Sequence, residues 1–101
     1  MRPRFTKDVG EWEVVQTTNK AAKRAGFLHR KVVYQGRRGA GDDWYFGPNG
    51  RLIIVEHKRP GKEPSEQQAR EHKRLRALGF DVRVVSTVSQ ARRLFDIEDL
   101  A

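Results

Sequence analysis

The amino-acid sequence predicts an α/β domain, with a small mixed β-sheet of about four strands flanked by helices in the order αβββαβα. Residues 52–55 are consecutive apolar, mostly β-branched residues between turn signals, as expected of a buried strand. A helical pattern separates the third predicted strand from the fourth, so that connection must cross over the sheet and make it mixed. The length of 101 residues is typical of a single domain, residues 1–101.

The first helix is predicted over residues 8–25, after a flexible basic arm at residues 1–7. Asp8 is a suitable N-cap, and Gly26 is a suitable stop. Trp12 and Val14 would widen an apolar stripe that recurs at helical spacing through Val15, Thr18, Ala22 and Ala25.

Three strands should follow this helix. The first is predicted at residues 27–34 and leads into a basic, glycine-rich loop. Residues 47–50 read Gly-Pro-Asn-Gly, a dense turn signal between the aromatic stretch 44–46 and the strand that begins at Leu52. The last two strands should therefore pair as an antiparallel hairpin.

A second helix is predicted over residues 65–78. Ser65 and Gln68 have the spacing of a capping box, and a glycine follows the helix. We expect Leu75 and Leu78 to face inward.

The remaining chain is predicted to form a strand and a helix. Residues 80–86 are rich in valine, as in a strand. Thr87 and Gln90 repeat the capping-box spacing before a last helix that would end near Phe95 or Leu100.

The charge of the chain favours a polyanionic partner. It has 21 Lys and Arg residues against 13 Asp and Glu residues, a formal net charge of +8. Nucleic acid is the commonest polyanion that basic proteins bind. The candidate DNA-binding residues, in two glycine-containing loops and the second helix, are Arg37, Arg38, Arg59, Lys62 and Lys73. A solvated turn is the alternative for the loop that contains Arg37 and Arg38.

The absence of cysteine excludes disulfides and cysteine nucleophiles. The longest apolar run is far shorter than a membrane span, and no signal-peptide pattern follows the basic start. We therefore expect a soluble protein of the cytoplasm, in a bacterial host cell if it is encoded by a phage, with no membrane partner.

Charged residues converge at one end of the predicted hairpin. Glu56 and Lys58 should project to one side of their strand and His57 to the other. The hairpin would bring Asp42 or Asp43 beside them, and converging carboxylates repel unless a cation joins them. Mg²⁺, with its preference for oxygen ligands, is a natural partner, and a nearby lysine can orient a metal-bound water.

Three other polar residues have two interpretations each. Glu11 lies on the inward stripe of the first helix and could join the site, whereas Glu13 lies on the polar side; the alternative for Glu11 is to complement the helix dipole. Gln68 could support the site or only cap its own helix. His72, one turn after Gln68, could reach the same surface or be solvated.

The chain resembles the VRR-NUC group (virus-type replication and repair nucleases) of the PD-(D/E)xK superfamily, from Glu11 to about Leu94. That group has a glycine-rich turn with Pro-Asp, a hairpin to Glu-x-Lys, Arg-Pro-Gly, Ser-x-x-Gln, Leu-Gly and a valine-rich strand. The corresponding segments here are Gly39-Ala40-Gly41-Asp42, Glu56-His57-Lys58-Arg59-Pro60-Gly61, Ser65-Glu66-Gln67-Gln68, Ala77-Leu78-Gly79 and Val82-Arg83-Val84-Val85.

The resemblance implies a restriction-endonuclease-like core and a set of site residues. The implied metal ligands are Asp42, Glu56, the backbone carbonyl of His57 and Glu11. Lys58 would position the attacking water, and Gln68 would support the site. The family's proline is Gly41 here, which leaves Asp43 as the alternative to Asp42.

The resemblance also implies a Mg²⁺- or Mn²⁺-dependent endonuclease that acts on branched DNA as a homodimer, like a Holliday junction resolvase. One alternative is a module of the same fold that binds nucleic acid without cutting it, driven by counterion release. Another is a structural protein whose basic face binds an acidic protein.

Overall fold

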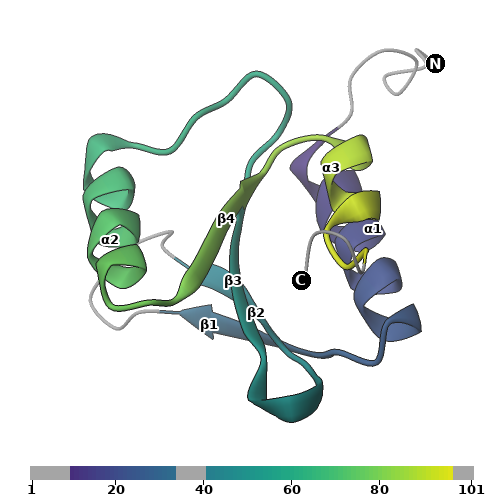
Figure 1. Cartoon of the computed structure of the whole chain (residues 1–101). Helices are drawn as coiled ribbons and strands as arrows, with labels where there is room; N and C mark the ends of the chain where they lie inside the picture. The colour runs from purple at the N-terminus through teal and green to yellow at the C-terminus, as the bar shows by residue number, and fades with distance from the viewer. Residues whose placement is uncertain (1–9, 34–40, 97–101) are drawn as a thin grey trace, which may run out of the picture.

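The computed structural model describes residues 10–33 and 41–96 (Figure 1). Its elements, in chain order, are α1 (Glu11–Arg24), β1 (Leu28–Val33), β2 (Gly41–Phe46), the 3₁₀ turn η1 (Pro48–Gly50), β3 (Leu52–His57), α2 (Glu66–Ala77), β4 (Asp81–Val85) and α3 (Val88–Arg93). The predicted order αβββαβα is confirmed.

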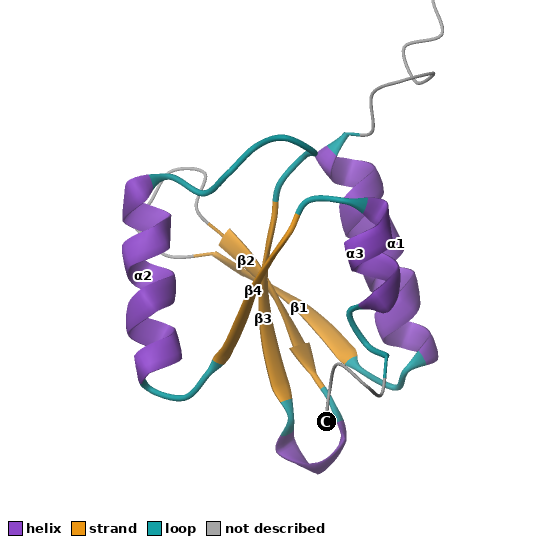
Figure 2. Ribbon diagram, turned by 45° about the horizontal axis from the view of Figure 1, so that its top comes forward, coloured by secondary structure: helices purple, strands orange, loops and turns teal. Residues whose placement is uncertain are grey.

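The sheet has four strands in the order β1-β2-β3-β4. The β1–β2 and β2–β3 pairs are antiparallel, whereas β3 and β4 are parallel. The mixed character follows from α2, which carries the chain across the sheet between β3 and β4. In Figure 2, α2 covers one side of the sheet, and α1 and α3 cover the other. The α/β fold class predicted from the sequence is therefore confirmed.

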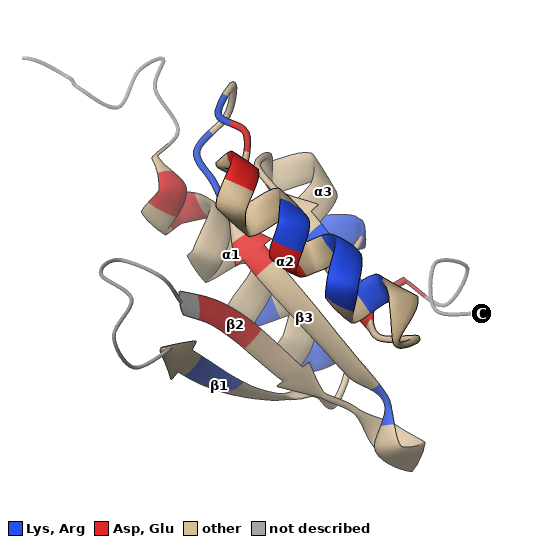
Figure 3. Ribbon diagram, turned by 90° about the vertical axis from the view of Figure 1, so that its left-hand side faces the viewer, with Lys and Arg blue, Asp and Glu red and all other residues tan. Residues whose placement is uncertain are grey.

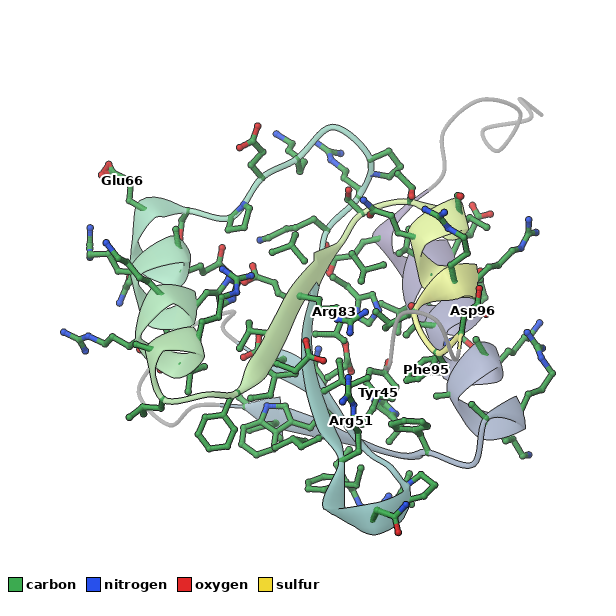
Figure 4. All side chains as sticks on the ribbon, in the orientation of Figure 1. Tyr45, Arg51, Glu66, Arg83, Phe95 and Asp96 are labelled. Atoms are coloured by element: carbon green, nitrogen blue, oxygen red, sulfur yellow. The ribbon has the colours of Figure 1, made fainter. Side chains whose placement is uncertain are left out.

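The main hydrophobic core lies between the sheet and the α1–α3 pair. Tyr45 and Ile53 supply its centre from β2 and β3, and both are fully buried. The ring of Phe95 meets Tyr45 edge to face, with centroids 5.4 Å apart, and both residues lie between the sheet and the two helices (Figure 4). This packing fixes the sheet against α1 and α3.

The opposite face is packed much less. Ile54 and Val82 are buried there, but the only buried residue of α2 itself is His72. A helix with so little apolar burial gains little from the hydrophobic effect. Its start is instead stabilised by the capping box of Ser65 and Gln68, which the sequence predicted.

Helix α1 differs from its prediction at the N-terminal end. It begins at Glu11 with Gly10 as the N-cap, and the predicted cap Asp8 lies outside the described residues. Trp12 does not belong to the inward stripe and is 70% exposed. The reason is angular, since two positions along a helix rotate a side chain by about 200° away from the buried Val14.

Helix α2 also differs from its prediction. Leu78 was expected to face inward but is 75% exposed. It is the C-cap, and Gly79 with φ of +96° then turns the chain toward β4. Leu78 therefore lies where the helix has already ended. Helix α3 ends at Arg93, close to the nearer of the two predicted ends.

Candidate metal site

The register of the β2–β3 hairpin places Asp42 beside Glu56. Asp43 is paired with Val55, so one further step along both strands brings Asp42 to Glu56. Since paired residues share a face of the sheet and neighbours alternate, Asp42 and Glu56 lie on the α2 face. Asp43 and His57 lie on the α1–α3 face. The hairpin thus separates two adjacent aspartates.

Asp42, Glu56 and His72 form a compact group of possible metal ligands. Each offers one ligand atom, and these atoms all lie within 4.8 Å of one another. The residues come from β2, β3 and α2, and they are only 6%, 3% and 3% exposed. Figure 3 shows acidic segments on β2 and β3, and on α2 both acidic and basic segments, of which the basic ones predominate. Among residues 10–33 and 41–96, these are the acidic and histidine side chains whose possible ligand atoms gather this closely in a group of three.

The carboxylate of Glu56 lacks well-aligned donors. Its Oε1 lies 2.8 Å from Nε2 of His72, and its Oε2 lies 3.1 Å from Nζ of Lys58. Neither contact has the angles of a hydrogen bond, and both oxygens are buried. A buried carboxylate without aligned donors is costly, and a cation bound between the three side chains would stabilise it. Two carboxylates and an imidazole suit a divalent ion.

Lys58 follows β3 directly, and its side chain is a quarter exposed. The backbone N–H of Lys58 donates to the carbonyl of Val85 at 3.0 Å, on the β4 side. Because C=O and N–H point in opposite directions across a trans peptide, the carbonyl of His57 points toward β2. Asp42 is on that strand.

A second polar network fills the opposite face of the sheet. Asp43 is hydrogen-bonded at 2.7 Å both to Nδ1 of His57 and to Nε2 of His29. Nε2 of His57 also lies 2.9 Å from the hydroxyl of Thr18 in α1, which donates to the carbonyl of Val14. The network therefore ties the β2–β3 hairpin to α1.

This network determines the charge state of Asp43. Burial raises the pKa of Asp43, but the hydrogen bonds from His57 and His29, and the charges of His57 and Lys31, outweigh it and lower the pKa below its usual value. Burial, with a smaller effect of Asp43, raises the pKa of Tyr45, so its hydroxyl stays protonated and donates to Asn19 at 2.6 Å. Asp43 is thus an ionised structural group.

The other predicted site residues lie outside the group. Glu11 and Glu13 are exposed in the first turn of α1. The side-chain oxygen of Gln68 accepts from the backbone N–H of Ser65 at 2.8 Å, so it caps α2. Arg59, Lys62 and Lys73 are exposed, as expected for residues that contact DNA; Arg37 and Arg38 lie outside the described residues.

Two features were missed or left undecided by the sequence. The sequence indicates His72 only through its spacing of one helical turn from Gln68, which leaves a solvated position as the alternative. The Asp43–His57–His29 network was not expected. The alternation in β3 placed His57 opposite Glu56, but nothing in the sequence indicated that His29 would reach the same carboxylate.

Comparisons with known proteins show that this chain is similar to a protein named as a putative nuclease and to a VRR_NUC domain. No family model matches the chain. Over 65 residues it is 45% identical to "Putative nuclease p44" of Acyrthosiphon pisum secondary endosymbiont phage 1. The aligned segment covers 64% of this chain and 70% of that protein. A solved structure described as a VRR_NUC domain aligns with a TM-score of 0.77 at 34% identity, over 86% of this chain and 95% of the other.

Proposed function

Since the chain belongs to the VRR-NUC family and has a PD-(D/E)xK-like core, we propose that it is a Mg²⁺- or Mn²⁺-dependent DNA endonuclease. The observation that supports this proposal best is the buried pair of Asp42 and Glu56 beside Lys58, with Glu56 oxygens that lack hydrogen-bond donors. A protein that only binds DNA gains nothing from carboxylates turned toward phosphate.

In the proposed mechanism, Asp42 and Glu56 hold the divalent ion, with the backbone carbonyl of His57 directed to the same side. The bound ion would supply an activated water and polarise the scissile phosphate. Lys58 would orient the attacking water and balance the negative charge that develops at the phosphate. No side chain has to act as a nucleophile.

Two residues would act from outside the buried group. Gln68 would support the site through α2, whose first turn it caps. Glu11 lies at the exposed start of α1, outside the buried group. We propose that it contributes to the binding of metal or substrate from there. Its test is Glu11→Gln, for which we expect a smaller loss of cleavage than for Glu56→Gln.

We also propose that the substrate is branched DNA. A domain of this size without an added recognition module reads shape and backbone more than sequence. The exposed basic residues Arg59 and Lys62 follow the site directly in the chain, and Lys73 lies on α2 one residue after the candidate ligand His72. Arg37 and Arg38, which precede β2 in the sequence, are proposed to contact the DNA as well.

A homodimer is the proposed functional form, and an apolar row on the α2 face supports it. Leu28, Phe46 and Leu52 are in register across β1, β2 and β3, and Phe80 precedes β4 at the same level. Leu28, Phe46 and Phe80 are exposed. An exposed apolar row of this kind is typical of an association surface. It lies on the site's face, about 13 Å along β2 from Asp42.

The experiment that tests the activity uses a labelled four-way junction and a matched linear duplex, with Mg²⁺, with Mn²⁺ and with chelator. We expect metal-dependent cutting of the junction that Glu56→Gln lacks while DNA binding is retained. Equal cutting of both substrates would contradict the preference for junctions. Binding without cutting under every condition would favour the non-catalytic module.

A further inference from the structure

Helix α2 buries a histidine where a hydrophobic residue is usual. His72 is 3% exposed, and every other residue of α2 is at least partly exposed. Burying an imidazole in place of an apolar side chain gives up hydrophobic stabilisation unless the ring has a polar partner. The partner that the structure supplies is the metal-ligand candidate Glu56.

The contact between the two residues has the spacing of neighbouring metal ligands. Nε2 of His72 and Oε1 of Glu56 are 2.8 Å apart without hydrogen-bond angles. Ligands at about 2.1 Å from an octahedral ion lie about 3 Å from their neighbours, so a shared ion accounts for this separation. Both buried oxygens of Glu56 lack an aligned hydrogen-bond donor, which also favours a cation at this position.

We propose that His72 is a direct ligand of the metal, through Nε2, and that it shifts the site's preference from Mg²⁺ toward first-row transition-metal ions such as Mn²⁺. This inference rests on the proposed function, because it adds a ligand to the same site. Mg²⁺ strongly prefers oxygen ligands and water, whereas imidazole suits transition metals better. One nitrogen among the ligands therefore discriminates between the two.

The chain is well suited to a direct test, because it has only three histidines. His29 and His57 are bonded to Asp43 on the other face of the sheet. Mn²⁺ is added to metal-free full-length protein without DNA, and electron spin-echo envelope modulation is used to detect nitrogen bound to the ion. A parallel titration measures Mn²⁺ affinity and its competition by Mg²⁺.

We expect nitrogen modulation in the wild-type chain, its loss in His72→Gln and its retention in the matched control His29→Gln. The wild type should bind Mn²⁺ at least tenfold more tightly than Mg²⁺. His72→Gln should reduce this ratio severalfold while leaving Mg²⁺ affinity nearly unchanged, because glutamine supplies an oxygen instead.

Two outcomes would overturn the inference in different ways. Mn²⁺ binding that depends on Asp42 but shows no nitrogen modulation would refute the role of His72 and leave the proposed nuclease site intact. No binding of either ion would refute the metal site as well. If His72→Gln does not fold, nitrogen modulation in the wild type and in His29→Gln decides the question, because its absence from both chains would refute an imidazole bound to the ion.

Discussion

At the scale of single residues, Asp42 and Asp43 show how one step along a strand separates two tasks. Asp42 belongs to the candidate metal site on the α2 face. Asp43 is bonded to two histidines on the other face, where its pKa is lowered. The same residue type is thus proposed to bind metal at one position and to stabilise the fold at the next.

The pair Asp42→Asn and Asp43→Asn tests this division. Asp43→Asn should lower the free energy of unfolding by about 2–4 kcal/mol, because the buried network loses one of its two acceptor oxygens and its negative charge. In chelator, the free energy of unfolding of Asp42→Asn should lie within about 1 kcal/mol of the wild-type value, since the substitution relieves repulsion with Glu56. Only Asp42→Asn should abolish Mn²⁺ binding. Urea denaturation and metal titration measure both, and equal destabilisation would contradict the assignment.

The sequence placed these residues only partly. The hairpin turn and the Leu52 strand were enough to bring Asp42 or Asp43 to Glu56, but the choice between them depends on register. A shift of one residue exchanges the two faces. The register is determined by packing of Tyr45 and Ile53 against α1 and α3, which the local sequence does not contain.

At the scale of elements, α2 relies on its cap more than on its core contacts. Its start is closed in both directions by Ser65 and Gln68. The helix carries His72 one turn further on. The interpretation of Gln68 as a cap and its proposed role in the site are therefore compatible, because the cap positions the helix.

Substitutions at Gln68 separate these roles. Gln68→Glu keeps the capping oxygen and should retain cleavage and stability. Gln68→Ala removes it and should cost about 0.5–2 kcal/mol, with faster amide exchange in the first turn of α2. Loss of cleavage in Gln68→Glu, with unchanged amide exchange, would show that the amide nitrogen acts in the site itself.

The turn before η1 depends on a glycine for space rather than for conformation. Gly47 has φ of −112°, which any residue adopts. A Cβ at this position would lie only 2.3 Å from the ring of Phe27, a core residue packed against Phe95. Because glycine has no Cβ, this turn can approach the core closely.

Gly47→Ala should therefore destabilise the fold by about 1–3 kcal/mol through overpacking. The double variant with Phe27→Leu should show a favourable coupling, because the smaller side chain makes room for the methyl group. Urea denaturation of the four chains measures this coupling. Additive effects of the two substitutions would indicate that the ring and the turn do not compete for space.

At the scale of the whole molecule, the chain has a formal net charge of +8, whereas its candidate metal site is acidic and buried. The proposed function therefore assigns attraction to DNA and the chemistry of cleavage to different residues. The basic residues near the site are exposed, whereas the candidate ligands are buried. No helix in the described part of the chain is long and apolar enough to cross a membrane.

DNA affinity should fall steeply with salt, because phosphate contacts release counterions. Lys62→Gln and Lys73→Gln should each reduce the slope of log K against log salt by about 1. Lys20→Gln is the matched control, since Lys20 is exposed on α1, which covers the other side of the sheet. Fluorescence anisotropy in chelator measures binding without cutting. An equal reduction of the slope by Lys20→Gln would indicate that DNA does not prefer the α2 side of the sheet.

The proposed dimer makes a separate prediction. Phe46→Glu should convert a dimer into a monomer in sedimentation experiments, because it places a charge in the apolar row of Leu28, Phe46 and Phe80. Trp12→Glu is the matched control, as it is an equally apolar, exposed residue on α1. A wild-type chain that is monomeric at micromolar concentration would refute the dimer.

The sequence by itself determined the elements and their order, because turn signals, capping boxes and apolar periodicity act over a few residues. It also determined that one of the two adjacent aspartates, Asp42 or Asp43, approaches Glu56, since a hairpin joins neighbours in the chain. Only the tertiary structure decided that Asp42 rather than Asp43 meets Glu56, that His72 is buried against it, and that Trp12 and Leu78 face outward. These outcomes depend on the register of the strands, the rotation of α1 and the end of α2, which are decided by packing between segments far apart in the chain.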